Sequence, residues 1–157
     1  MNLMIVKKFF YKFYSGKDIK LKEIFMQVNS INKTNFQAEI IPSKALSYAL
    51  EHAQEEAKIG TKNGLKHAQT FYNNLRTIEK DRRVDVFHVD GDSANFHPYI
   101  QFGKKLSLLR LYGFSPKDLA YSIMEEVNKL VEGRYLRDQI SDEAKNVDLT
   151  KAFERWI

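Results

Sequence analysis

The sequence contains no cysteine, and this absence alone excludes disulfide scaffolds, zinc ribbons, cysteine nucleophiles and thiol redox chemistry. Proline is scarce, with 3 residues, and no stretch rich in proline, glycine or serine interrupts the chain as a linker would. No hydrophobic run approaches the roughly 18 residues that a membrane-spanning helix requires, so we expect no transmembrane segment. Without linkers or internal repeats, the 157 residues are predicted to form a single globular domain over 1–157.

The N-terminus also lacks the pattern of a cleaved secretion signal. Lys7 follows only a short uncharged stretch, whereas a signal peptide places its positive charge before a longer apolar segment. Because the chain shows no export signal and no cysteine, we expect an intracellular protein, with the cytoplasm as the default compartment.

Positive charge is concentrated toward the start of the chain. The formal net charge is +5, and residues 1–83 hold 15 basic and 8 acidic side chains, against 10 and 12 in residues 84–157. Residues 1–22 alone hold six lysines and one aspartate. Such asymmetry predicts a basic surface suited to phosphate, an acidic partner or an anionic membrane, although a solvated face that serves solubility has the same composition.

The sequence KKFFYKFYSGK, residues 7–17, interleaves lysines with aromatic residues. In sites for single-stranded nucleic acid, cationic side chains follow the backbone while aromatic rings stack on bases, so this pattern favours binding of single-stranded DNA or RNA. The candidate contact residues are Lys7, Lys8, Tyr11, Lys12, Tyr14, Lys17, Lys20 and Lys22. The alternative is a core strand whose phenylalanines point inward and whose lysines reach solvent.

Hydrophobic periodicity predicts the order of the secondary-structure elements. Strand patterns occur at residues 3–14, 36–41, 84–89, 96–102 and 105–112, the last of which is also compatible with a short helix. Apolar residues recur at helical spacing in 21–31, 45–57, 65–80, 119–131 and 149–156. The order is strand, helix, strand, antiparallel helix pair, three-stranded meander and further helices. It predicts an α+β fold in which helices pack on a small, mostly antiparallel sheet.

Local start and stop signals bound the helix near residues 119–131 most clearly. Ser115 is expected to be its N-cap, with Pro116 at the first helical position and Asp118 in the first turn. Gly133 is expected to end the helix, since glycine is the common residue after a helix C-terminus. Ser122 is expected on the polar face, opposite the apolar residues.

The stretch FHVDGDSANFH, residues 87–97, places two histidines and two aspartates close together. If residues 90–95 form a loop, His88 lies directly opposite His97 on the less apolar side of a hairpin. Two adjacent imidazoles could then act as general base and general acid in a metal-independent nuclease. The alternative is that the aspartates and glycine only provide ordinary turn chemistry.

No metal site or cofactor is predicted. The residues that could supply nitrogen and oxygen ligands are His88, Asp90, Asp92 and His97, but their spacing matches no metal motif. The calcium-loop pattern also fails, because Asn95 and Gln101 stand where it requires glycine and glutamate. His52 and His67, on the expected helix pair, are predicted to be surface residues without a chemical role.

Three functional hypotheses follow from these patterns. The first is a small basic non-enzymatic binding or accessory protein that contacts single-stranded nucleic acid or RNA through its N-terminal basic and aromatic region. The second is a protein-interaction subunit of a larger assembly, or an inhibitor, with Phe153, Trp156 and Ile157 as apolar anchors. The third is the nuclease that uses His88 and His97. The sequence favours binding over catalysis.

Overall fold

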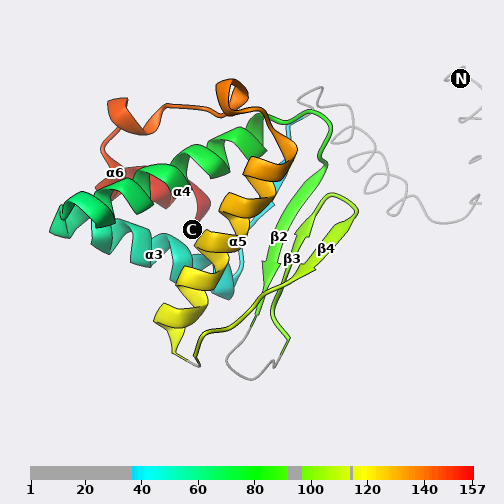
Figure 1. Cartoon of the computed structure of the whole chain (residues 1–157), viewed down its shortest axis with the longest axis horizontal. Coiled ribbons are helices and arrows are strands. Elements are labelled where there is room, and N and C mark those ends of the chain that lie inside the picture. The colour runs from blue at the N-terminus through cyan, green and yellow to red at the C-terminus, as the bar shows by residue number, and fades with distance from the viewer. Residues whose placement is uncertain (1–36, 92–96, 114) are drawn as a thin grey trace, which may run out of the picture. The chain divides into compact units, whose positions relative to one another are not determined.

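The computed structural model describes residues 37–91, 97–113 and 115–157. Within these ranges a sheet lies against a layer of helices (Figure 1), and the predicted α+β class is confirmed. The strand predicted at 3–14 and the helix predicted at 21–31 lie outside the described residues.

The sheet is mixed rather than purely antiparallel. Its strand order is β1-β2-β3-β4, with bounds Glu39–Ile41, Val86–Asp90, Tyr99–Phe102 and Lys105–Leu108. β1 runs parallel to β2, and parallel neighbours need a long crossover, which the intervening helical residues 44–80 supply. β2, β3 and β4 form the predicted antiparallel meander. The pattern at 105–112 is therefore a strand, and it ends at Leu108.

The helices lie on one side of the sheet. They are α3, α4, α5 and α6, with bounds Lys44–Ile59, Lys62–Lys80, Pro116–Arg134 and Leu149–Ala152. α4 returns along α3 as the predicted antiparallel pair (Figure 1), and Gly60 makes the break between them in the left-handed region, at φ 72°. Among the described residues, no helix combines the length and apolar character needed to cross a bilayer.

Serine caps fix where two of these helices begin. The Ser43 side chain accepts a hydrogen bond from the Leu46 amide at 3.1 Å, at the start of α3. At the start of α5, the Asp118 amide donates to the Ser115 hydroxyl at 3.1 Å, and the Ser115 amide donates to the Asp118 carboxylate at 3.1 Å. This reciprocal capping box confirms the predicted start, and a cap of this kind contributes about 1 kcal/mol.

Two predictions for α5 are wrong. The helix continues through Gly133, which is not among the described glycines of positive φ, and Tyr135 is its C-cap. The Tyr135 backbone is extended, so the chain leaves the helix at that residue, and the Tyr135 hydroxyl donates a hydrogen bond to Asp81. Ser122 is buried instead of facing solvent. Its hydroxyl donates a hydrogen bond to the Asp118 carbonyl at 2.9 Å, and this bond allows the polar side chain to be buried.

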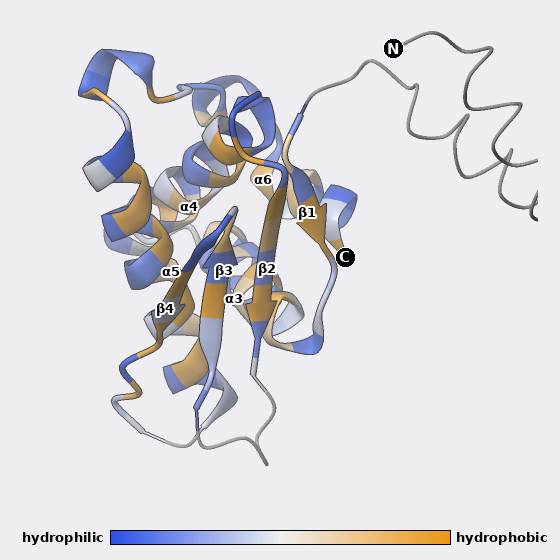
Figure 2. Ribbon diagram, turned by 90° about the vertical axis from the view of Figure 1, so that its right-hand side faces the viewer, coloured by the Kyte–Doolittle hydropathy of each residue, from blue (hydrophilic) through white to orange (hydrophobic). Residues whose placement is uncertain are grey.

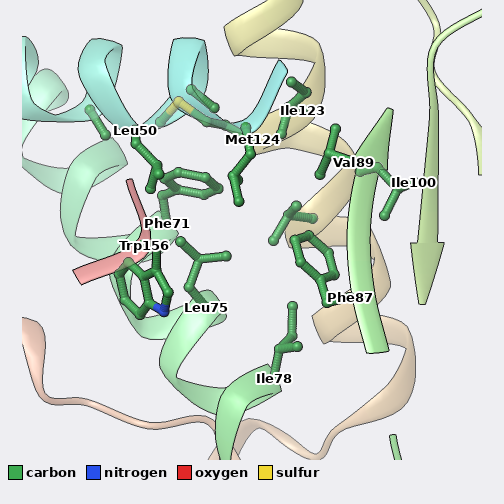
Figure 3. Close-up of a cluster of buried hydrophobic side chains, with 14 of the residues drawn as sticks. Leu50, Phe71, Leu75, Ile78, Phe87, Val89, Ile100, Ile123, Met124 and Trp156 are labelled. Carbon is green, nitrogen blue, oxygen red and sulfur yellow. The ribbon is translucent and has the colours of Figure 1, made fainter. Parts of the chain in front are cut away.

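The hydrophobic core lies between the sheet and the helices. Figure 3 shows side chains from α3, α4 and α5 meeting those from β2 and β3. The largest fully buried side chains include Leu50, Phe71, Leu75, Ile78, Phe87, Val89, Ile100 and Ile123. Strand alternation directs Phe87, Val89 and Ile100 toward the helices and the residues between them away. Each such side chain stabilises the fold by about 1.5–3 kcal/mol relative to exposure.

The C-terminal residues complete this core. The Phe153 and Trp156 rings lie 5.8 and 5.5 Å from the Tyr72 ring of α4, and both are buried. The Asn73 side-chain oxygen accepts hydrogen bonds from two backbone amides of the same tail, those of residues 143 and 144, at 3.0 Å each. The hypothesis that Phe153 and Trp156 anchor a partner therefore fails for these two rings, because the chain's own helices cover them. Ile157 is 57% exposed.

Candidate functional site

The nucleic-acid contact residues predicted from sequence lie outside the described residues. They are Lys7, Lys8, Tyr11, Lys12, Tyr14, Lys17, Lys20 and Lys22. The remainder of the sequence is balanced in charge, because residues 37–157 carry 18 basic and 18 acidic side chains. Residues 1–36 carry seven basic and two acidic side chains, so the formal charge of +5 belongs entirely to that segment.

The structure does not form the predicted histidine pair. His88 lies opposite Gln101, and Asp90 opposite Tyr99, so the predicted register is wrong. His97 is exposed before the start of β3, four positions from Gln101, which corresponds to roughly 13 Å along a strand. The last residue pair of β2 and β3 is Asp90 with Tyr99, so the connection between these strands extends past the predicted loop at 90–95.

The prediction that His88 lies on the less apolar side of the hairpin is nevertheless correct. His88, Tyr99 and Gln101 face away from the helices, and the His88 and Tyr99 rings meet edge to face at 6.5 Å. Within the described ranges no group of three His, Asp or Glu side chains could hold a metal ion. Asp92, one of the weighed ligands, is outside the described residues. The geometry on which the nuclease hypothesis depends is therefore not assembled.

A polar cluster that sequence analysis missed lies where α3, α4 and α5 meet. Glu56 Oε1 accepts a hydrogen bond from the Tyr121 hydroxyl at 3.3 Å. The same oxygen lies 3.5 Å from His52 Nε2 and 3.6 Å from His67 Nδ1. The His52 side chain is 12% exposed, so its predicted surface position is wrong, whereas His67 is 55% exposed. This cluster brings a carboxylate and two imidazoles together, and such groups can exchange a proton.

Two polar atoms of this cluster lack hydrogen-bond partners in the described structure. Glu56 Oε2 and His52 Nε2 are buried and have no hydrogen-bond partner among the described residues. Burial, together with the neighbouring Glu56 charge, raises the pKa of Tyr121 and keeps its hydroxyl protonated as a donor. Glu56 thus has room for one further donor.

A buried carboxylate, that of Asp81, lies at the end of α4 and is surrounded by hydrogen-bond donors. It accepts hydrogen bonds from the Tyr135 hydroxyl at 2.6 Å, Arg134 Nε at 3.1 Å and the Arg83 amide at 2.8 Å. Burial alone would raise the pKa of Asp81, but these donors outweigh it and lower the pKa to about 2. Burial and the Asp81 charge raise the pKa of Tyr135. This network ties the end of α4 to the end of α5.

A depression of about 480 Å³ opens beside Asp81. Its cationic wall consists of Lys80, Arg82 and Arg83. Lys80 forms an ion pair with Glu143, and Arg83 lies 3.3 Å from the Asp81 carboxylate. Arg82 is the member of this trio without an ion pair in the described part of the chain. Because carboxylates of the fold already neutralise most of the wall, it is a weak site for an anion.

The open face of the sheet is the clearest exposed apolar surface. Figure 2, viewed from the sheet side, shows the strands with none of the described helices over them. The register places Leu106 opposite Gln101 and Leu108 opposite Tyr99, so both leucines are on the face turned away from the helices. Leu106 is 66% exposed and Leu108 is 72% exposed. The two leucines therefore form an exposed apolar patch on this face of the sheet.

Among the described strands, β4 is the last in the order, so no described strand pairs with its outer edge. The Leu109 amide donates to the Pro98 carbonyl at 2.8 Å, which sets the alternation along the strand. In an antiparallel pair every second residue bonds to the neighbouring strand, so Ser107 faces β3 while the N–H and C=O groups of Leu106 and Leu108 point outward. The two exposed leucines therefore also carry the unpaired backbone groups of the edge.

Cationic side chains flank this edge. Lys104, Lys105 and Arg110 are exposed and form no ion pair within the described ranges. Arg110 is nevertheless close enough to Glu125 of α5 to add to the effect of Lys129 and Tyr112, which lower the pKa of that carboxyl. Arg110 lies over the Tyr112 ring at 5.8 Å, and Tyr112 is itself an exposed aromatic residue. The leucine edge is thus bordered by positive charge at both ends.

Alternation in the sequence KLSL, residues 105–108, was the signal that could have found this surface, because it places both leucines on one face. It could not show which face the helices cover. No protein-family model, no curated protein and no solved structure matches this chain. The functional argument therefore depends on the surface itself.

Proposed function

We propose that this protein is a protein-interaction module that docks a partner protein on the open face of its sheet. The observation that supports the proposal is the exposure of Leu106 and Leu108 side by side on that face. Covering an exposed leucine side chain contributes about 1.5–3 kcal/mol, so a partner that covers both gains affinity from this small area. The half-buried His88 and Tyr99 extend the same face with rings that can join the contact.

Affinity capture with the full-length chain tests this proposal. Replacing both leucines, as Leu106→Asp with Leu108→Asp, should reduce recovery of a specific partner by about tenfold or more, because charge replaces the apolar contact. Leu136→Asp is the matched control, since Leu136 is also 66% exposed but follows α5 instead of lying on the sheet. Quantitative mass spectrometry should show the same partner with the wild type and the control.

A photoreactive residue in place of Gln101, which lies opposite Leu106, adds a positional readout. It should form a covalent adduct with the captured protein. A partner that the double leucine variant still captures, or that crosslinks equally from position 136, would contradict docking on the open face.

Contact with single-stranded nucleic acid is a second candidate, favoured by the charge distribution. The excess of basic residues belongs to residues 1–36, whereas residues 37–157 are balanced. Cationic and aromatic side chains together suit a flexible polyanion. A labelled oligonucleotide should therefore bind the full chain at low salt and dissociate as salt rises, because cation release drives such binding.

Lysine substitutions give this second candidate a matched control. Lys7→Gln, Lys8→Gln and Lys12→Gln together should weaken oligonucleotide binding. The same change at three exposed lysines of the helix pair should not; these are Lys58, Lys62 and Lys66. Equal losses from both triple variants, or binding that ignores salt, would overturn the proposed nucleic-acid contact.

A further inference from the structure

We infer that the partner adds a strand to the free edge of β4, and that its contacting segment is extended, apolar at alternate positions and acidic at its ends. This inference rests on the proposed function and names the kind of partner that the open face accepts. Three features lie together at β4: exposed leucines, backbone groups unpaired in the described structure, and flanking cations.

The backbone of β4 is arranged to receive a strand. Leu106 and Leu108 direct their N–H and C=O groups away from β3, while Lys105 and Ser107 bond to it. An antiparallel segment would exchange two pairs of hydrogen bonds with these residues. Directly opposed residues share a face, so the segment's side chains opposite the leucines would lie on the open face beside them. Strand addition would therefore satisfy the edge and cover the leucines together.

Cationic side chains near both ends of β4 favour a partner segment that carries acidic residues. Lys104 and Lys105 lie at one end of β4 and Arg110 lies beyond the other. Acidic residues flanking a short apolar segment would meet these side chains as the strand aligns. Opposite charges across an interface chiefly set register and partner choice.

A second copy of the chain fits the edge less well. The two-fold arrangement that pairs Leu106 with Leu108 of the other copy is centred on Ser107. Continuing that register places Lys104 of one copy opposite Arg110 of the other, so like charges meet at both ends. Lysines on exposed edge strands are a common device against such self-pairing. The charge distribution therefore favours a different protein that carries acidic residues.

A peptide titration on the full-length chain tests the inference. The probe is the acetylated and amidated peptide Glu-Glu-Leu-Thr-Leu-Thr-Glu-Glu, followed by isothermal titration calorimetry and by NMR chemical-shift changes. We expect binding that shifts the amides of β4 and spares those of α5. A peptide with lysine at all four glutamate positions should bind about tenfold or more weakly, because it meets the flanking cations.

Backbone methylation separates strand addition from side-chain docking. When the peptide's leucines face the open side, their amides point toward β4 and the threonine amides point away. Methylating the two leucine amides should weaken binding about tenfold or more, since it removes hydrogen bonds at the edge. Methylating the two threonine amides is the matched control and should leave binding nearly unchanged.

A protein variant gives the complementary test. Leu106→Pro removes an outward amide without removing a bond to β3, and Leu106→Val keeps that amide. Peptide binding should be lost in the proline variant and retained in the valine variant. Equal binding by both variants, equal effects of the two methylated peptides, or no binding of the acidic peptide would overturn strand addition. A partner that still requires the leucines in affinity capture would leave the proposed function standing in each of those cases.

Discussion

Two carboxylates of the helical layer, the buried Asp81 and the half-buried Glu56, differ in how many hydrogen-bond donors surround them. Asp81 accepts hydrogen bonds from a tyrosine hydroxyl, a guanidinium and a backbone amide, and its pKa falls to about 2. Glu56 accepts one longer hydrogen bond, from Tyr121, and its second oxygen is buried without a partner in the described structure. Asp81 therefore has several hydrogen-bond donors around its carboxylate, whereas Glu56 has one.

This difference in donors predicts which carboxylate contributes more to the stability of the fold. A buried anion that is fully hydrogen-bonded links the elements that supply its donors, and removing one partner leaves uncompensated charge. Asp81 joins the end of α4 to Arg134 and Tyr135 at the end of α5. A buried oxygen without a donor costs free energy instead. Glu56, which is also less deeply buried than Asp81, should therefore contribute little to stability.

Asp81→Asn should have the largest effect. The neutral amide replaces a buried carboxylate that accepts hydrogen bonds from Tyr135, Arg134 and the Arg83 amide, so we expect the free energy of unfolding to fall by about 2 kcal/mol. Urea unfolding followed by far-UV circular dichroism measures the loss. Asp85→Asn is the control, because Asp85 is an exposed carboxylate close by in the chain. Equal losses in the two variants would remove the distinction between the carboxylates.

Acid should weaken the wild type through the same residue. Because folding lowers the pKa of Asp81 from 3.8 to about 2, its contribution is present above pH 4 and is lost as the pH falls toward 2. A shift of this size corresponds to about 2 kcal/mol. Glu143 titrates in the same window, because Lys80 and Arg76 lower its pKa to about 2. The difference between wild type and Asp81→Asn over this pH range isolates Asp81, and parallel curves would contradict its role.

Glu56→Gln should change stability by less than about 1 kcal/mol, in either direction. Tyr121 can still donate to the amide oxygen, and the amide nitrogen replaces an oxygen that has no donor in the described structure. Urea unfolding beside Asp81→Asn makes the comparison direct. A loss as large as that of Asp81→Asn would show that the imidazoles stabilise Glu56 more than their distances indicate.

His67→Ala should have the smallest effect, below about 0.5 kcal/mol, since exposed substitutions away from special features rarely cost more. The His67 ring is 55% exposed and lies 3.6 Å from Glu56. Thermal unfolding at neutral pH measures this difference. A larger loss would mean that His67 supplies the donor that Glu56 otherwise lacks.

Sequence patterns predicted the elements better than their contacts. Periodicity located α3, α4 and the meander, because apolar spacing follows directly from the geometry of helices and strands. The hairpin register was wrong because it depends on a close approach that no pattern encodes. A Cβ at Gly91 would lie 2.8 Å from the Pro98 side chain, so glycine permits this approach beyond the last paired residues.

The candidate sites were less predictable because their residues come from distant parts of the sequence. Asp81 lies 54 positions from Tyr135, and Glu56 lies 65 positions from Tyr121, so neither network leaves a local signature. The spacing of Leu106 and Leu108 was visible, but the helices decide which sheet face stays open. The apolar tail was also visible, and only the fold shows that Trp156 packs on this chain's own α4.

The sequence holds one tryptophan, and its position gives the molecule an internal optical reporter. Trp156 is buried beside Tyr72 and Phe153, and its ring nitrogen lacks a hydrogen-bond partner within the described ranges. Indole emission shifts to longer wavelength when water reaches the ring. Detachment of the C-terminal residues from α4 should therefore change the colour of the emitted light, even where the helices themselves remain folded.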